Sequence, residues 1–138
     1  MPHLLVIDDE PQIRRTLARA FSCDFVVTCA PDAESALAMI DEGTLEGVVL
    51  FDAVVCDMKL PRMSGHDLYD ELLCRCHELV GRIVILSGAT PDGDDAFATS
   101  LGERYMLKPC PMVDLIAILR RLAMPRVTVP WTAPVIAA

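Results

Sequence analysis

The chain has 138 residues, 53% of them are hydrophobic, and its formal net charge at pH 7 is −8. That length predicts a single domain with a buried core, and so high an apolar fraction excludes an intrinsically disordered chain. The negative charge and the lack of a basic cluster argue against direct binding of nucleic acid or anionic lipid. They favour a divalent cation or a partner with a basic surface.

The six cysteines lie mostly within apolar runs, as in VVTCA and AVVCDM. We expect them to be reduced and to serve mostly as small core residues, because the chain can build a core without disulfides and no signal peptide opens it. No apolar run approaches the roughly 18 residues of a membrane-spanning helix. We therefore expect a cytoplasmic protein that does not contact a membrane.

The first third of the chain predicts two strands and two helices in alternation. Residues 4–8 form the apolar run of a short buried strand, and Pro11 suits the first turn of a helix over residues 11–22. Residues 25–30 predict a second strand and residues 32–43 a second helix. The apolar stripes expected to face the core are Ile13, Leu17 and Phe21 in the first helix, and Ala33, Ala36, Leu37 and Ile40 in the second.

The middle of the chain repeats this alternation after a long connection. Residues 44–51 (TLEGVVLF) predict either a short extra strand or a loop packed by its apolar residues. A third strand is predicted over residues 52–57, a loop over 60–65, and a helix over 65–78. The residues expected to pack inward are Val48, Val49, Leu50 and Phe51 in the connection, and Leu68, Leu72 and Cys76 in the helix.

The last third completes the pattern. Residues 82–88 predict a fourth strand, residues 95–101 at best a short helix, and residues 104–109 a fifth strand. Pro111 opens a final helix, whereas residues 125–138 contain three prolines and no helical period, which predicts a linker or tail. The residues of the final helix expected to face inward are Leu115, Ile118, Leu119 and Leu122.

Five successive strand–helix units predict an α/β fold. Strands separated by helices pair in parallel through right-handed crossovers, and nearly continuous apolar strands need helices on both faces of the sheet. We therefore predict one domain over residues 1–124, built as a three-layer, doubly wound, five-stranded parallel sheet with about five helices.

Polar residues mark the carboxyl ends of four predicted strands. They are Asp8 and Asp9, Asp57, Ser87 and Lys108. Ligands of open parallel sheets bind beyond these ends. Three close carboxylates repel one another unless a cation neutralises them, and oxygen ligands with room for water suit Mg²⁺. A carboxylate beside Mg²⁺ can attack phosphorus while a lysine and a hydroxyl hold the phosphoryl oxygens, so the pattern predicts phosphoryl transfer to a carboxylate.

Four motifs, each at a predicted strand end, follow one another as VIDDE, VVCDMKLPRMSG, VILSG and YMLKP. Together they make residues 3–123 resemble the receiver domain of two-component response regulators, the CheY-like family. The resemblance implies a flavodoxin-like sheet of order 2-1-3-4-5. It also implies a phosphorelay switch that assists its own phosphorylation and dephosphorylation, and not an enzyme acting on an independent metabolite.

The resemblance implies roles for the acidic residues. Asp57 would be the phosphoacceptor. Mg²⁺ would be held by Asp9 directly, by Asp8 largely through water, by Asp57, and by the backbone carbonyl of Lys59.

The resemblance also implies the switching residues. Ser87 would bond the phosphoryl group, and Lys108 would pair with the phosphoacceptor and then with the phosphate. The peptide bond between Lys108 and Pro109 would be cis. Tyr105 matches the aromatic switch position, where inward and outward rotamers couple to the hydroxyl of Ser87, although a tyrosine on an edge strand can also serve packing alone.

The implied phosphoryl donor is a sensor histidine kinase or a histidine phosphotransfer protein. The face around residues 88–123 would bind a downstream protein, or a second copy of the chain in a homodimer. The segment after the fourth strand is rich in glycine and aspartate and makes a poor helix, which is similar to receivers attached to hybrid sensor kinases.

Two other functions stay open as alternatives. A degenerate receiver would act as an interaction module without phosphorylation, although all five site residues are present. A hydrolase with an aspartyl-phosphate intermediate would carry a second carboxylate two residues after the nucleophile, where this chain has Lys59. The CRCH stretch suggests a metal motif, but Cys74 and Cys76 would point about 200° apart on a helix, so we expect no metal there.

Overall fold

The computed structural model describes residues 1–90 and 95–124, so the predicted tail at 125–138 lies outside the described residues. Five parallel strands form one sheet in the order β2-β1-β3-β4-β5, which confirms the predicted fold class and strand order. The strands are β1 (His3–Ile7), β2 (Val26–Ala30), β3 (Ala53–Asp57), β4 (Ile83–Ser87) and β5 (Tyr105–Leu107).

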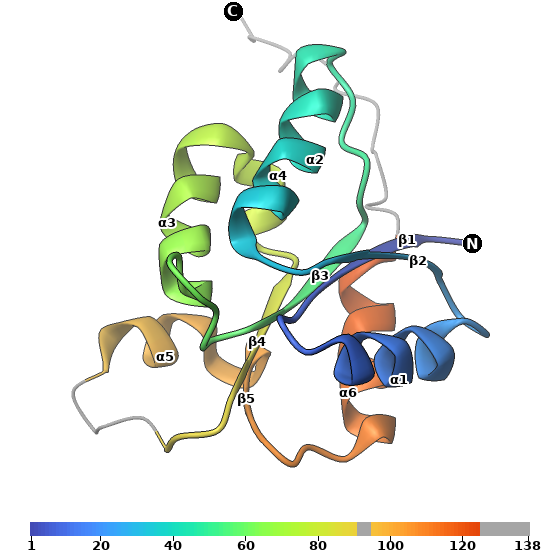
Figure 1. Cartoon of the computed structure of the whole chain (residues 1–138), viewed down its shortest axis with the longest axis vertical. Helices are drawn as coiled ribbons and strands as arrows, with labels where there is room; N and C mark the ends of the chain where they lie inside the picture. Colours follow the sequence, from blue (N-terminus) through green and yellow to red (C-terminus); the bar gives the residue numbers. More distant parts are fainter. Residues whose placement is uncertain (91–94, 125–138) are drawn as a thin grey trace, which may run out of the picture.

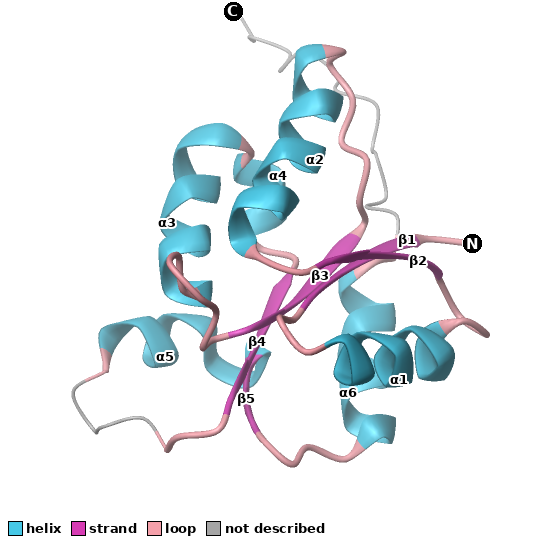
Figure 2. Ribbon diagram, viewed as in Figure 1, coloured by secondary structure: helices cyan, strands magenta, loops and turns pink. Residues whose placement is uncertain are grey.

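Six α-helices in the described residues cover the sheet on both faces, so the predicted three layers are present (Figure 1). One face packs against α1 and α6, and the other packs against α2, α3, α4 and α5 (Figure 2). None of these helices is long and apolar enough to cross a lipid bilayer. The helices are α1 (Pro11–Phe21), α2 (Ala33–Leu45), α3 (Gly65–Arg75), α4 (His77–Val80), α5 (Ala96–Leu101) and α6 (Met112–Leu122), with a 3₁₀ turn at Gly102–Arg104.

Alternate residues of the strands face the two helical layers. In β1, Leu4 and Val6 belong to the core beneath α1 and α6, whereas Leu5 and Ile7 belong to the core beneath the other four helices. All four side chains are buried. Because strand side chains alternate with a period of two, a sheet covered on both faces requires this unbroken apolar run.

Local signals set where the helices begin. Pro11 occupies the first position of α1, where its missing N–H costs no helical hydrogen bond. The Asp32 side chain accepts a hydrogen bond of 2.7 Å from the N–H of Ser35 and so caps α2. At the start of α3, Ser64 and Asp67 form a reciprocal capping box.

The prediction of one helix over residues 65–78 is wrong. α3 ends at Arg75 and α4 begins at His77, because Cys76 between them is extended, with φ −150° and ψ 80°. The bend keeps Cys76 in the core and also buries Leu79 of the short second helix.

The predicted connection at residues 44–51 contains no extra strand. Its first two residues are the end of α2, which continues to Leu45, and the rest is a loop in which Gly47 turns the chain with a positive φ of 72°. The predicted packing is right only for Phe51, which is buried, and wrong for the three apolar residues before it, which are exposed. The connection passes over the end of α2, where nothing within the described residues covers them.

The expectation that most cysteines serve the core is confirmed, whereas one stripe residue needs correction. All six cysteines are free; Cys56 and Cys76 are buried, Cys29 and Cys110 are half-buried against the core, and Cys23 and Cys74 are exposed. In the α1 stripe, Ile13 is exposed because it lies near the end of the helix where the chain leaves the sheet, although the two later stripe residues are buried.

Candidate functional site

The central strands β1 and β3 bring the acidic residues together. Ile7 pairs with Cys56 in the parallel register, so the residues that follow them, Asp8 and Asp57, leave the sheet side by side. One carboxylate oxygen from each of Asp8, Asp9 and Asp57 lies within 4.8 Å of the other two. Because β1 lies between β2 and β3, where the strand order reverses, the predicted cluster lies at the topological switch point of the sheet.

Asp8 is the most buried member of this cluster, with 2% of its surface exposed. Burial raises the pKa of Asp8 above its ordinary value, and the neighbouring carboxylates of Asp57 and Asp9 raise it further. Opposing effects come from the N–H of Glu10, which donates a hydrogen bond of 2.9 Å to Asp8 Oδ1, and from the positive charge of Lys108. Burial and the two neighbouring carboxylates outweigh these groups, so the net shift of the Asp8 pKa is upward.

The two oxygens of Asp57 have different partners. Lys108 Nζ lies 3.1 Å from Oδ2, and the backbone N–H of Lys59 donates to Oδ1 at 3.2 Å. The side chain of Asp57 is only 12% exposed. The carboxylate is thus held in one orientation, between an ammonium group from β5 and an amide from the loop after β3.

An open cleft of about 550 Å³ leads to this carboxylate. Its walls come from the loops after β1, β3, β4 and β5, so it collects the ends of four strands. Such a cleft admits a small charged group to one face of the acidic cluster. The residues lining it are Asp9, Glu10, Asp57, Lys59, Leu60, Pro61, Gly88 and Lys108.

Gly65 lets the first turn of α3 approach the end of β3. A Cβ added at this glycine would lie 2.9 Å from the carbonyl oxygen of Asp57 and 3.1 Å from Cα of Met58, both of them backbone atoms. The N–H of Gly65 also donates a hydrogen bond of 2.9 Å to the carbonyl of Met58. A residue without a side chain is therefore needed here to close the loop that carries Lys59.

Ser87 ends β4 and is 3% exposed. Its hydroxyl donates to the carbonyl of Ala89 at 3.1 Å and accepts from the N–H of the same residue at 3.2 Å. The N–H of Lys108 bonds the carbonyl of Ser87 at 2.8 Å, which places the predicted hydroxyl and ammonium residues on adjoining strand ends. The peptide bond between Lys108 and Pro109 is cis, as the family resemblance implied.

Tyr105 is half-buried at the start of β5 and packs against the core beneath α3 and α5. Its ring meets the ring of Phe97 edge to face, with centroids 6.5 Å apart. In the parallel register Tyr105 pairs with Ile85, two residues before Ser87, so the tyrosine and the serine lie on the same face of the sheet.

Sequence reasoning missed the aromatic group around Phe97. The ring of His66 in α3 stacks on Phe97 with centroids 4.0 Å apart, and Tyr69 meets Phe97 edge to face at 5.1 Å. The three residues come from two helices that no local pattern relates, so no motif signals their contact. Within the described residues, Asp8, Asp9 and Asp57 form the single group with metal-ligand geometry.

Comparisons with known proteins agree with this geometry. A family model described as "Response regulator receiver domain" matches residues 4–120. The "Transcriptional regulatory protein KdpE" of Mycobacterium tuberculosis is 32% identical over 126 residues, which cover 87% of this chain and 50% of that protein. The "Two-component response regulator PhoP" of Pseudomonas aeruginosa is 33% identical over 120 residues, 86% of this chain and 50% of that protein.

The chain thus spans about half the length of the curated relatives it matches. Among solved structures, a response regulator receiver domain protein from Clostridium thermocellum superposes with a TM-score of 0.73 at 25% identity, covering 89% of this chain and 94% of that one. The signal receiver domain of an HD domain-containing protein from Pseudomonas fluorescens Pf-5 has a TM-score of 0.67 at 26% identity, with coverage of 88% and 93%. The chain belongs to the response regulator receiver domain family.

Proposed function

We propose that this chain is a phosphoacceptor switch of two-component signalling in which Asp57 receives the phosphoryl group. The observation that carries the proposal is the position of Lys108 Nζ, 3.1 Å from an Asp57 carboxylate that lies within 4.8 Å of two further carboxylates. An acidic cluster with one fixed ammonium group suits a reaction in which negative charge arrives on a phosphoryl group.

The donor set fits Mg²⁺. Asp8, Asp9 and Asp57 offer oxygen ligands close enough to share one ion, and the cleft leaves room for water ligands. The backbone carbonyl of Lys59 is the fourth proposed protein ligand. The ion would neutralise the acidic cluster and the incoming phosphoryl oxygens. The raised pKa of Asp8 supports this assignment, because burial and the two neighbouring carboxylates outweigh the positive charge of Lys108, so a further cation would stabilise the charged form.

The proposed chemistry is an in-line displacement. A carboxylate oxygen of Asp57 forms a bond to phosphorus, the P–N bond of a phosphohistidine breaks, and the imidazole leaves with the electron pair. Lys108 stays beside the acceptor and pairs with the phosphoryl oxygens as they arrive. The product is an acyl phosphate on the protein, so the chain is a substrate of its partner kinase or histidine phosphotransfer protein and not an enzyme for a separate metabolite.

The signal would leave through Ser87 and Tyr105. The Ser87 hydroxyl would exchange its bonds with Ala89 for one with the phosphoryl group, and the space it vacates would let Tyr105 turn inward. The surface around residues 88–123, as far as it is described, would then change its affinity for a downstream protein or for a second copy of the chain.

We further propose that residues 1–124 form the receiver unit, that residues 125–138 are a linker or tail, and that the protein works in the cytoplasm. The location follows from the proposed donor, because histidine kinases of such relays phosphorylate their receivers there. Attachment to a hybrid kinase or to an output domain would place the same unit within a longer chain.

The deciding experiment is intact-mass measurement after incubation with acetyl phosphate or phosphoramidate, with and without Mg²⁺. We expect a gain of one phosphoryl group, ~80 Da, that needs Mg²⁺ and disappears in Asp57→Ala. Asp70→Ala, which removes an exposed carboxylate from α3, is the matched control and should keep the adduct.

Two results would contradict the proposal. An untouched donor and no adduct in the wild type would identify an interaction module that works without phosphorylation. Continuous release of inorganic phosphate from small phosphomonoesters would identify a hydrolase with an aspartyl-phosphate intermediate instead.

A further inference from the structure

Four large apolar residues lie exposed at the end of α2 and in the loop that follows it, and we call them the apolar strip. Leu45 is 89% exposed, Val48 is 49% exposed, and Val49 and Leu50 are each 41% exposed. Single exposed apolar residues are ordinary, but a run of them within six positions is the kind of patch that marks a binding surface.

The strip is held in a defined shape by the end of α2. The N–H of Val48 donates to the carbonyl of Gly43 at 2.8 Å, and the N–H of Gly47 donates to the carbonyl of Thr44 at 3.0 Å. Leu50 folds back over Gly43, where a Cβ would lie only 2.6 Å from Leu50 Cγ. A partner would therefore meet a preorganised surface, which lowers the entropy cost of binding.

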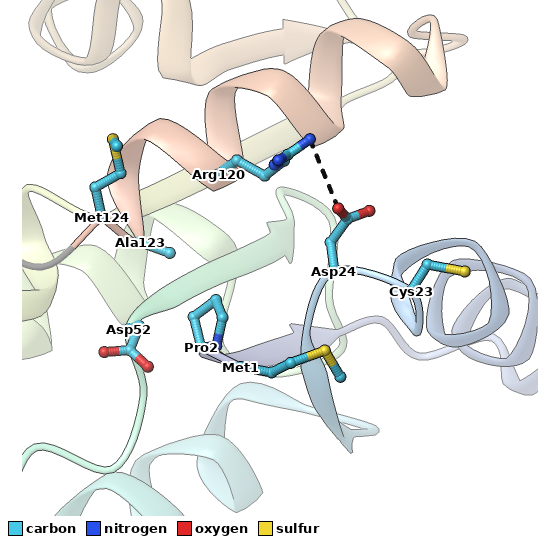
Figure 3. Close-up of a pocket in the computed structure, with 8 residues that line it drawn as sticks. All are labelled: Met1, Pro2, Cys23, Asp24, Asp52, Arg120, Ala123 and Met124. Carbon is cyan, nitrogen blue, oxygen red and sulfur yellow. Dashed lines mark ion pairs between the residues drawn. The ribbon is translucent and has the colours of Figure 1, made fainter.

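The end of α6 lies close to where the strip leads into β3. Ala123 and Met124 line a pocket of about 520 Å³ whose wall also includes Asp52, two residues after Leu50. Figure 3 shows Ala123 and Met124 on one side of this pocket and Asp52 on the other. The chain beyond Met124 thus starts across one small pocket from the strip.

The segment that starts there has a composition suited to an apolar surface. Residues 125–138 read PRVTVPWTAPVIAA, in which Arg126 is the only charged residue. They include the only tryptophan of the chain, Trp131. Seven extended residues span up to about 25 Å, which gives Trp131 ample reach from Met124 to the strip.

We propose that residues 127–136 dock on the apolar strip of the same chain, with Trp131 as the main anchor. A segment tethered this close has an effective concentration in the millimolar range, so it competes well against a free partner. The strip lies at the edge of the sheet opposite the acidic cleft. The docked tail therefore leaves Asp57 accessible, and the proposal does not depend on the phosphoacceptor function.

The fluorescence of Trp131 reports on the environment of residues 125–138, because the chain contains no other tryptophan. We would measure its emission maximum and its quenching by acrylamide in the full chain, and compare both with a free peptide of residues 125–138. We expect a blue-shifted maximum and a several-fold lower quenching constant in the full chain. The double variant Val48→Ser/Val49→Ser should move both values to those of the peptide, whereas Leu73→Ser, equally exposed on α3, should not.

A second measurement tests the proposal without changing the strip, so that it remains valid if the double variant misfolds. In Trp131→Ser, which leaves the strip intact, hydrogen exchange of the amides of Val49 and Leu50 should become several-fold faster than in the wild type. Peptide-like quenching in the wild type would overturn the proposal, as would unchanged exchange in Trp131→Ser. Protection of Trp131 that rises with protein concentration together with a dimer mass would also overturn it, because a second copy would then occupy the strip.

Discussion

The two ends of the strands carry their charged residues in different arrangements; we call the carboxyl ends the carboxyl edge and the amino ends the opposite edge. At the carboxyl edge, Asp8, Asp9 and Asp57 lie within 4.8 Å of one another and share a single close ammonium group. At the opposite edge the charges are dispersed. Asp24 meets Arg120 at 3.7 Å, and Asp52 accepts a bond of 2.8 Å from the backbone N–H of His3.

This difference distinguishes charged groups whose partners lie within the protein from charged groups that need a bound ligand as a partner. A charge paired one to one needs nothing further, whereas three carboxylates with one cation hold an excess of negative charge that costs stability until a ligand arrives. The opposite edge exposes apolar surface instead, so what it lacks is a covering segment. The carboxyl edge is therefore suited to bind a cation, and the opposite edge is suited to bind an apolar segment.

The largest effect should come from removing the ammonium group at the carboxyl edge. Lys108→Met takes away the group that pairs with Asp57, and we expect phosphorylation by acetyl phosphate to slow on the order of 100-fold. Arg120→Met removes the corresponding cation from the opposite edge and should leave the rate unchanged. Time courses of intact mass measure both, and equal slowing in the two variants would show that Lys108 has no special part.

Two glycines test how closely each edge is packed. Gly65→Ala should cost about 2 kcal/mol of unfolding free energy, because its Cβ meets the fixed backbone of Asp57 and Met58. Gly43→Ala also creates close contacts, with Leu50 Cγ at 2.6 Å and with the backbone carbonyl oxygen of Val48 at 2.7 Å, so it should destabilise the fold too. Part of that cost is offset because alanine favours the helix by about 1 kcal/mol, so we expect the smaller net loss at Gly43.

Urea unfolding of both glycine variants measures the difference. Gly65→Ala should also lower phosphorylation, since it displaces the loop that orients the acceptor, while Gly43→Ala should not. A larger loss of stability in Gly43→Ala would show that the strip, and not the acceptor loop, is the more rigid edge.

The metal-free cluster should become more stable when one charge is removed. Asp8→Asn keeps an oxygen for the N–H of Glu10 but removes a buried negative charge, so we expect the melting temperature without Mg²⁺ to rise by a few degrees. The same variant should lose the increase in melting temperature that Mg²⁺ gives the wild type. Thermal melts with EDTA and with Mg²⁺ test both expectations.

The difference in stability between Asp8→Asn and the wild type should change with pH in a defined direction. Burial and two neighbouring carboxylates raise the pKa of Asp8 above its ordinary 3.8, so the fold favours its neutral form. The stability due to Asp8 is fully present below pH 3.8 and is lost as the pH rises through the higher pKa of the folded state. The advantage of Asp8→Asn should therefore be absent in acid and appear towards neutral pH. An advantage that is constant with pH would have another cause.

Most of the fold could be predicted because the strands are short, mostly apolar runs, four of which end at a polar residue and the other at Pro31. The break at Cys76 could not, since Leu68, Leu72 and Cys76 keep helical spacing and no glycine or proline marks the bend. Nor could the exposure of Val48 and its neighbours, because apolar character predicts burial only where another element is available to cover it.

Some features of the candidate site could likewise be predicted from the sequence, and others could not. The strand ends carrying Asp8, Asp57 and Lys108 could be found because parallel register alone brings them to one edge. The stacking of His66 on Phe97 could not, since it depends on how α3 and α5 pack against each other. The hydrogen bond between the Ser87 hydroxyl and Ala89 could not be predicted either, because a serine hydroxyl in a turn can bond several neighbouring backbone groups.

The smallest expected effect lies at the rim of the carboxyl edge, where one exposed arginine bridges two carboxylates. Asp32 caps α2 through the N–H of Ser35 at 2.7 Å and lies 3.3 Å from Arg62, which also lies 3.6 Å from Glu34. Asp32→Ala should cost about 1 kcal/mol by loss of the cap, whereas Arg62→Met, which removes two ion pairs of an exposed side chain, should cost a few tenths at most.

Acid should erase the larger of these two effects. The hydrogen bonds from Ser35 hold the pKa of Asp32 below its ordinary 3.8, so the stability it supplies is present above that pH and is lost as the pH falls through the lower folded value. Urea unfolding of the wild type and Asp32→Ala should therefore converge in strong acid. The sign is opposite to that of Asp8→Asn: as the pH rises from strong acid, Asp32→Ala becomes less stable than the wild type, whereas Asp8→Asn becomes more stable. The two carboxylates of one edge thus distinguish a charge that completes the fold from one that awaits a cation. If both variants gained, or both lost, stability relative to the wild type as the pH rises, that distinction would fail.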